Sequence, residues 1–210
     1  MTGSKTLYLV RHGQTPWTAA ERVQGWAPVP LNDAGRDQLR ATGAYLDERV
    51  DADAVCIETS DLRRASQSAE IVADRLGDRA TITSRKALRE RDFGVLQGLD
   101  DTRYHRVKES HTGDGPGALL RAPERGESWR EVENRTLEAW WEIVEATVAD
   151  EPRIVVSHTG PMYCVLAAVT GRRLEAEMNA TDLPEGGVFE IEIATEDGES
   201  RLVGDVWTPE

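Results

Sequence analysis

The sequence predicts an α/β fold, a three-layer α/β/α sandwich with a mostly parallel central sheet. Short apolar runs recur along the chain, each with the length and composition of a strand covered on both faces. Segments with apolar residues at helical spacing alternate with these runs. The 210 residues are 39% hydrophobic and 30% charged, which suits one domain with a sizeable core and not a disordered or membrane protein.

Three runs are predicted as central strands. They are TLYLV (6–10), DAVCIE (53–58) and RIVVS (153–157), which are rich in β-branched and other apolar residues. Near the end of the chain, GVFEIEI and RLVGDVW alternate apolar and polar residues on either side of Gly198. This alternation predicts a hairpin or two late strands.

Three helices are predicted between these strands. Asn32 is a suitable N-cap for the first, which follows the first strand. Thr59 or Ser60 is expected to cap the second, whose apolar face runs over 62–76. A third helix is predicted over 128–149, with its tryptophans in the core.

One domain is predicted over residues 1–210, with a loop-rich insertion around 99–127. Within it, 112–126 contains four glycines and two prolines, which is typical of a mobile loop. Substrate specificity is expected to lie in this insertion. Most of its arginines are expected to face solvent, and the alternative is that they contact a second anionic group of the substrate. These arginines are Arg103, Arg106, Arg121 and Arg125.

The charge and the cysteines restrict the class of protein. A net charge of -13 argues against nucleic-acid or anionic-membrane binding, so any phosphate chemistry needs a local positive pocket. The run 6–10 is too short for a signal peptide or a spanning helix, so a cytoplasmic location is expected. Cys56 and Cys164 have no metal-ligand spacing and are expected to be buried thiols.

An arginine, a histidine or both follow each of the three strands. Arg11 and His12 follow the first, Arg63 and Arg64 the second, and His158 the third. Because the carboxyl ends of parallel strands meet at one edge, these groups are expected to form an anion pocket. Arginine matches phosphate oxygens with its planar set of donors, and helix N-termini add backbone donors. Nearby arginines also keep an imidazole unprotonated, as nucleophilic attack requires.

Five motifs in order resemble the histidine phosphatase superfamily, also called the phosphoglycerate mutase-like family. They are LVRHGQT, SDLRRASQSAE, LRERDFGVLQG, RGESW and VVSHTG, and the resemblance covers about residues 6–166. It implies a phosphoglycerate mutase-like fold. It also implies hydrolysis of a small phosphorylated metabolite through a phosphohistidine, with no metal or other cofactor.

The resemblance gives roles to matching positions. His12 matches the nucleophile that attacks phosphorus, and Glu90 matches the acid that protonates the leaving oxygen. Arg63 is expected to be a surface neighbour of the phosphate-binding arginine. The remaining matches are Arg11, Arg64 and His158 for phosphate binding, and Gln24 and Gly25 for the substrate side.

Two positions depart from the family pattern. Thr18 follows Trp17 where the family often has asparagine, which removes an amide donor. Thr159 separates His158 from Gly160 where the family commonly has a glycine. The Thr159 hydroxyl is expected either to crowd the pocket or to bind phosphate.

Two alternatives to the hydrolase are a cofactor-dependent phosphoglycerate mutase of the same family and, less favoured, a non-catalytic binding module. Such modules commonly lose the nucleophile or the acid, whereas His12 and Glu90 are both present. The GPMYCVL that follows Thr159 favours the phosphatase branch. The expected partner is the small substrate, not nucleic acid or a membrane. The oligomeric state is not predicted, and a homodimer stays open.

Overall fold

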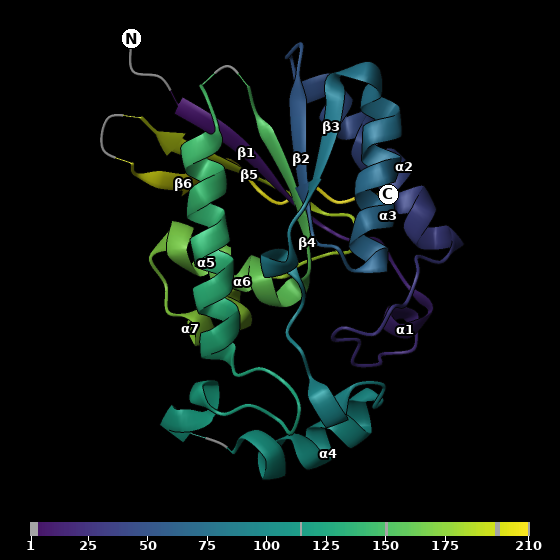
Figure 1. The fold of residues 1–210 in the computed structure, drawn as a ribbon, viewed down its shortest axis with the longest axis vertical. Helices are drawn as coiled ribbons and strands as arrows, with labels where there is room; N and C mark the ends of the chain where they lie inside the picture. Colours follow the sequence, from purple (N-terminus) through teal and green to yellow (C-terminus); the bar gives the residue numbers. More distant parts are fainter. Residues whose placement is uncertain (1–3, 114, 150, 196–197, 210) are drawn as a thin grey trace.

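The computed structural model describes residues 4–113, 115–149, 151–195 and 198–209. It contains the predicted sandwich, a six-stranded sheet between two layers of helices (Figure 1). The strand order is β3-β2-β4-β1-β5-β6. The strands β3, β2, β4 and β1 are parallel to one another, β5 pairs antiparallel with β1, and β6 pairs antiparallel with β5. The strands are β1 (Ser4–Arg11), β2 (Val55–Thr59), β3 (Ala80–Ser84), β4 (Arg153–Ser157), β5 (Val188–Ala194) and β6 (Ser200–Leu202).

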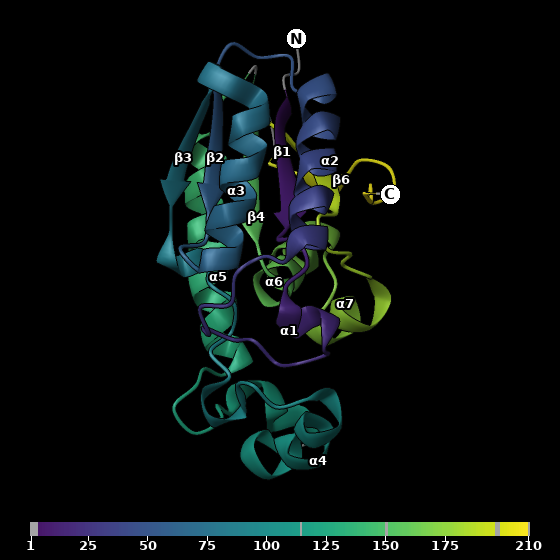
Figure 2. The ribbon, with the colours of Figure 1, turned by 90° about the vertical axis from the view of Figure 1, so that its right-hand side faces the viewer.

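Helices cover both faces of the sheet. The helices α2 and α3 pack on one face, and α5 and α6 pack on the other, as Figures 1 and 2 show from two sides. The α-helices are α1 (Pro16–Ala19), α2 (Asp33–Arg49), α3 (Arg63–Leu76), α4 (Asp101–Thr112), α5 (Trp129–Ala146), α6 (Thr159–Thr170) and α7 (Leu174–Ala180). Short 3-10 helices span Gly77–Arg79, Lys86–Leu88, Gly94–Leu96 and Gly115–Leu120.

The central strands are apolar because each feeds two cores. In β1, Leu9 packs into the core under α5 and α6, and Val10 packs into the core under α2 and α3. In β4, Val155 and Val156 divide in the same way. This double burial explains why continuous apolar runs, and not alternating ones, predicted these strands.

Two of the predicted helix starts are confirmed and one is wrong. The Asn32 side chain caps α2 by accepting from the Gly35 amide at 2.8 Å, and Ser128 forms a capping box with Glu131 at the start of α5. Neither Thr59 nor Ser60 caps α3, which begins after Leu62 with no side-chain cap. The chain first turns, and the Ser60 hydroxyl accepts from the Leu62 amide at 3.2 Å within that turn.

The insertion is more helical than predicted. Residues 101–112 form α4, and part of the predicted 112–126 loop forms the 3-10 helix Gly115–Leu120. Asp114 and the ends of the predicted domain, 1–3 and 210, lie outside the described residues. The helix α4 has no buried residue and lies beyond the end of the sandwich (Figure 1), so it lacks the apolar periodicity that predicts helices.

Three smaller predictions have mixed outcomes. The third helix ends at Ala146, not at 149, because Thr147 leaves the helical conformation. Cys164 is buried, but Cys56 is half-buried, since its neighbour β3 is an exposed edge strand. In the part of the chain that the structure describes, no helix has both the length and the apolarity to span a membrane.

Candidate active site

The carboxyl ends of β1, β2 and β4 bring the predicted cationic and imidazole groups together. Arg11 is the last residue of β1, His12 follows it, and Arg64 lies in the first turn of α3. His158 is the N-cap of α6, directly after β4. The ring centroids of His12 and His158 lie 5.1 Å apart. Arg63 is exposed beside buried Arg64, as predicted.

The two ring nitrogens of His12 have different partners. Nδ1 lies 2.8 Å from the carbonyl oxygen of Gly13, and Nε2 lies 3.2 Å from Nε of Arg64. A carbonyl only accepts and a guanidinium only donates, so Nδ1 carries the proton and Nε2 the lone pair. The surroundings thus select the tautomer in which Nε2 is the nucleophilic atom.

Both site histidines are held neutral. Burial lowers the pKa of His12 well below its usual range, and the charges of Arg64 and Arg11 lower it further. Burial likewise lowers the pKa of His158, with Arg64 the next largest cause. An uncharged His12 keeps its Nε2 lone pair over the neutral pH range.

The arginines are fixed by backbone carbonyls. Arg64 is 1% exposed and donates to the carbonyls of Gly25 at 2.9 Å and Ala27 at 3.3 Å. Burial lowers the pKa of Arg64 to about 10, so the guanidinium is charged at neutral pH. Arg11 donates to the carbonyl of Leu183.

Several buried polar atoms near His12 have no partner among the described residues. They are Nε of Arg11 and both ring nitrogens of His158. Unpaired buried polar groups are costly. A bound phosphoryl group is an anion with several acceptor oxygens, and it suits the donors among these atoms, which are Nε of Arg11 and the one protonated nitrogen of neutral His158.

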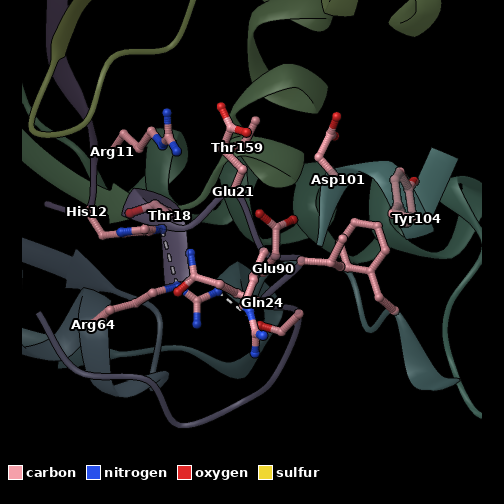
Figure 3. Close-up of a pocket in the computed structure, with 14 residues that line it drawn as sticks. Arg11, His12, Thr18, Glu21, Gln24, Arg64, Glu90, Asp101, Tyr104 and Thr159 are labelled. Carbon is pink, nitrogen blue, oxygen red and sulfur yellow. Dashed lines mark hydrogen bonds between the residues drawn. The ribbon is translucent and has the colours of Figure 1, made fainter. Parts of the chain in front are cut away.

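Glu90 is held by backbone amides across the pocket from His12 (Figure 3). Its Oε1 accepts from the amides of Arg91 at 2.7 Å and Gly160 at 3.2 Å, whereas Oε2 receives only the longer 3.3 Å branch from Gly160. Oε2 therefore has fewer hydrogen-bond partners than Oε1. A Cβ at position 160 would collide with Oε1, so only glycine permits this approach.

These groups surround a pocket of about 480 Å³. His158 does not line it, because its ring is fully buried beside that of His12. The predicted site residues that do line it are Arg11, His12, Thr18, Gln24, Gly25, Arg64, Glu90 and Thr159.

Thr18 and Gln24 present different groups to the pocket. The Thr18 hydroxyl donates to the Thr15 carbonyl and accepts from its amide, so it is used in the cap of α1. The Thr15 hydroxyl accepts two amides and donates to Oε1 of Gln24 at 3.0 Å. This bond fixes which end of the Gln24 amide is the oxygen. The Nε2 group of Gln24 has no partner among the described residues and can donate into the pocket.

Six pocket residues were not predicted as site residues. Nothing in the sequence marks them except their residue types, and such residues are common on any protein surface. They are Glu21, Arg22, Val23, Phe93, Asp101 and Tyr104. The four insertion arginines 103, 106, 121 and 125 are exposed, and none is among the lining residues. Among the described residues, no group of three or more His, Cys, Asp or Glu side chains is placed to hold a metal ion.

The six-stranded α/β/α sandwich has the phosphoglycerate mutase-like fold of its structural neighbours. The chain belongs to the histidine phosphatase superfamily (branch 1), which it matches over residues 7–206. This confirms the family and the fold that the sequence motifs implied. The family indicates a phosphatase-type enzyme.

Relatives in this family include both phosphatases and mutases. The chain is 33% identical over 180 residues to a glucosyl-3-phosphoglycerate phosphatase of Mycolicibacterium vanbaalenii, covering 80% of this chain and 75% of that protein. It is 34% identical over 179 residues to a probable phosphoglycerate mutase GpmB of Salmonella arizonae, covering 81% and 77%.

Solved structures agree with these relatives. A mycobacterial glucosyl-3-phosphoglycerate phosphatase complexed with VO3 has a TM-score of 0.78 at 26% identity, covering 98% of this chain and 100% of that chain. YhfR of Bacillus stearothermophilus has a TM-score of 0.79 at 30% identity, covering 96% of each chain. The relatives therefore indicate a phosphatase or mutase of the histidine phosphatase superfamily.

Acidification is expected to destabilise the protein through its two buried histidines. The folded pKa values of His12 and His158 lie well below the unfolded value of 6.5, so below that pH the unfolded chain binds protons that the folded chain excludes. Their contribution is complete above pH 6.5 and is lost as the pH falls, at about 1.4 kcal/mol per pH unit for each histidine.

Urea unfolding between pH 7.5 and pH 5 measures this slope. His158→Gln and His12→Gln are each expected to lower the slope by about one proton. Circular dichroism checks that both variants are folded. A wild-type slope in both variants would contradict the assignment of two neutral buried imidazoles.

Proposed function

We propose that this protein is a phosphomonoester hydrolase that acts on a small phosphorylated metabolite through a phosphohistidine at His12. The observation that carries the proposal is the fixed tautomer of His12, whose Nε2 lone pair lies beside Arg64 at a pocket of about 480 Å³. The phosphatases among the relatives support it. The net charge of -13 agrees with a small substrate and not nucleic acid or a membrane.

In the first step, Nε2 of His12 attacks phosphorus, the N–P bond forms and the ester P–O bond breaks. The departing alkoxide takes a proton from Oε2 of Glu90, which lies across the pocket from His12. Arg64 donates to Nε2 of His12, and an entering phosphoryl oxygen takes over this donor. The alcohol leaves, and Glu90 remains as the carboxylate.

In the second step, water attacks the phosphohistidine, and its proton passes to Glu90. The N–P bond breaks, inorganic phosphate leaves, and His12 returns to its neutral form. Arg11 and Arg64 neutralise the phosphoryl oxygens in both steps, so positioning and electrostatics supply most of the catalysis.

A labelled phosphoenzyme is expected when the protein meets a phosphorylated substrate. The bond should be acid-labile and base-stable, as expected of a phosphorus–nitrogen bond to imidazole. Rapid quenching after mixing with a 32P-labelled phosphomonoester measures it. His12→Ala should abolish the label, and His111→Ala, which alters a histidine outside the site, should keep it. Label that persists in His12→Ala would refute the nucleophile.

Glu90→Gln is expected to lower the hydrolysis of alkyl phosphates roughly 100-fold or more, the usual contribution of a general acid. Aryl phosphates should lose much less, because a phenolate leaves without protonation. Steady-state kcat/KM with glycerol 3-phosphate and p-nitrophenyl phosphate measures the two losses. Equal losses would count against Glu90 as the acid.

The second candidate is a phosphoglycerate mutase, which the GpmB relative favours. We expect hydrolysis of 3-phosphoglycerate to exceed its isomerisation, because the exposed residues Glu21 and Asp101 line the pocket and water can therefore enter it. The assay follows 2-phosphoglycerate and inorganic phosphate together, with catalytic 2,3-bisphosphoglycerate present. Mutase turnover well above hydrolysis would make the protein a mutase.

A further inference from the structure

The pocket has a second end, beyond the phosphate-binding groups. Figure 3 shows Arg11, His12 and Arg64 on one side and Asp101 and Tyr104 on the other. This second end, here named the rim, consists of Glu21, Arg22, Phe93, Asp101 and Tyr104. A phosphoester bound at His12 places its alcohol portion toward the rim, since the leaving oxygen must reach Glu90.

The backbone pairs the two acidic residues of the rim. The Asp101 amide donates to the Glu21 carbonyl at 2.9 Å, and Arg22 and Asp100 form an antiparallel bridge. Val23 exchanges hydrogen bonds with the same segment, through the Leu99 carbonyl at 3.0 Å and the Gly98 amide at 2.8 Å. This short pairing of 21–23 with 98–101 fixes the rim.

Glu21 is held in a conformation that is unusual for its residue type. Its φ is 49°, in the left-handed region that favours glycine. Such positions cluster at functional sites, where the surrounding structure enforces them. The pairing with Asp101 is the surrounding structure that enforces this one.

The rim side chains have capacity to bind a ligand. The Glu21 carboxylate and the Arg22 guanidinium have no partner among the described residues, and Asp101 pairs only with the exposed His105 of its own helix at 3.1 Å. Phe93 and Tyr104 are half-buried and stack edge to face with centroids 6.0 Å apart. The rim therefore offers two acceptors, donors from Arg22 and Tyr104, and an aromatic wall.

This chemistry distinguishes between kinds of alcohol. A second anion would meet two carboxylates and one arginine, and the insertion arginines that were candidates to bind it do not line the pocket. A cation would meet the same two carboxylates, but it would be repelled by the Arg22 guanidinium. An uncharged polyol satisfies both sets, because each hydroxyl donates to a carboxylate and accepts from a donor, and its C–H faces pack on aromatic rings.

We infer that the natural substrates are phosphomonoesters of uncharged polyols, and that Glu21 and Asp101 select against a second anionic group. This inference rests on the proposed hydrolase function. Its scope is the specificity of the rim and not the chemistry at His12.

Two substrates differ only in the group that the rim would contact. Glycerol 3-phosphate ends in a hydroxymethyl group where 3-phosphoglycerate ends in a carboxylate. We expect wild-type kcat/KM to favour glycerol 3-phosphate at least threefold. Exposed charges contribute roughly 1.5- to fivefold each, so Glu21→Gln with Asp101→Asn should narrow this ratio by about threefold or more. High salt should also narrow it.

Controls separate the rim from general effects. Glu48→Gln removes an exposed carboxylate of α2 that does not line the pocket, and it should keep the wild-type ratio. Hydrolysis of p-nitrophenyl phosphate reports the chemistry alone and should persist in the double variant. If no substrate is hydrolysed and no phosphoenzyme forms, the proposed function fails.

Three outcomes would overturn the rim inference while hydrolysis stands. The first is a wild-type ratio that favours 3-phosphoglycerate or is equal. The second is an unchanged ratio in the double variant. The third is a preference for phosphocholine over glycerol 3-phosphate, since the rim would then select a cation.

Discussion

The contact between the Arg64 guanidinium and Nε2 of His12 is the interaction on which the site depends. It places a buried cation 3.2 Å from an imidazole nitrogen, an arrangement that is tolerable only because the imidazole is neutral. The same contact selects the tautomer, and after burial it is the next largest cause of the lowered pKa of His12. Two further donors of Arg64 bind the carbonyls of Gly25 and Ala27 and so tie α3 to the loop after α1. One side chain thus links the charge, the nucleophile and the pocket wall.

The acid is positioned from the opposite layer of the sandwich. Arg135 of α5 donates to the carbonyls of Ala87, Arg89 and Glu90, and Trp26 adds a donor to the Glu90 carbonyl at 2.7 Å. Gly160 in the first turn of α6 holds the Glu90 carboxyl group. Arg64 of α3, on one face of the sheet, therefore contacts His12, and α5 and α6 on the other face hold Glu90.

In the function proposed here, chemistry and specificity reside in different parts of the molecule. The end of the pocket at His12 and Arg64 is built by buried residues of the sandwich. Close packing around such residues leaves little room for substitution. The rim is built by residues 21–23, 98–101 and α4, and α4 has no buried residue and lies beyond the sandwich. Charges on such an exposed segment alter substrate preference at small cost to folding. This separation agrees with relatives whose names include both phosphatases and mutases on one fold.

The sequence alone predicted the core of the fold and the histidines and arginines that meet at the carboxyl edge of the sheet. Runs such as 153–157 are apolar because they are buried on two faces, and parallel topology sends whatever follows them, here His158, to one edge. It did not give the start of α3, where a turn replaces the cap, or α4, whose exposed surface carries no apolar period. Only the tertiary structure decided which nitrogen of His12 bears its proton and which oxygen of Glu90 has fewer partners. It also brought Glu21 beside Asp101, 80 positions away, because such contacts depend on how distant segments pack and not on local residue order.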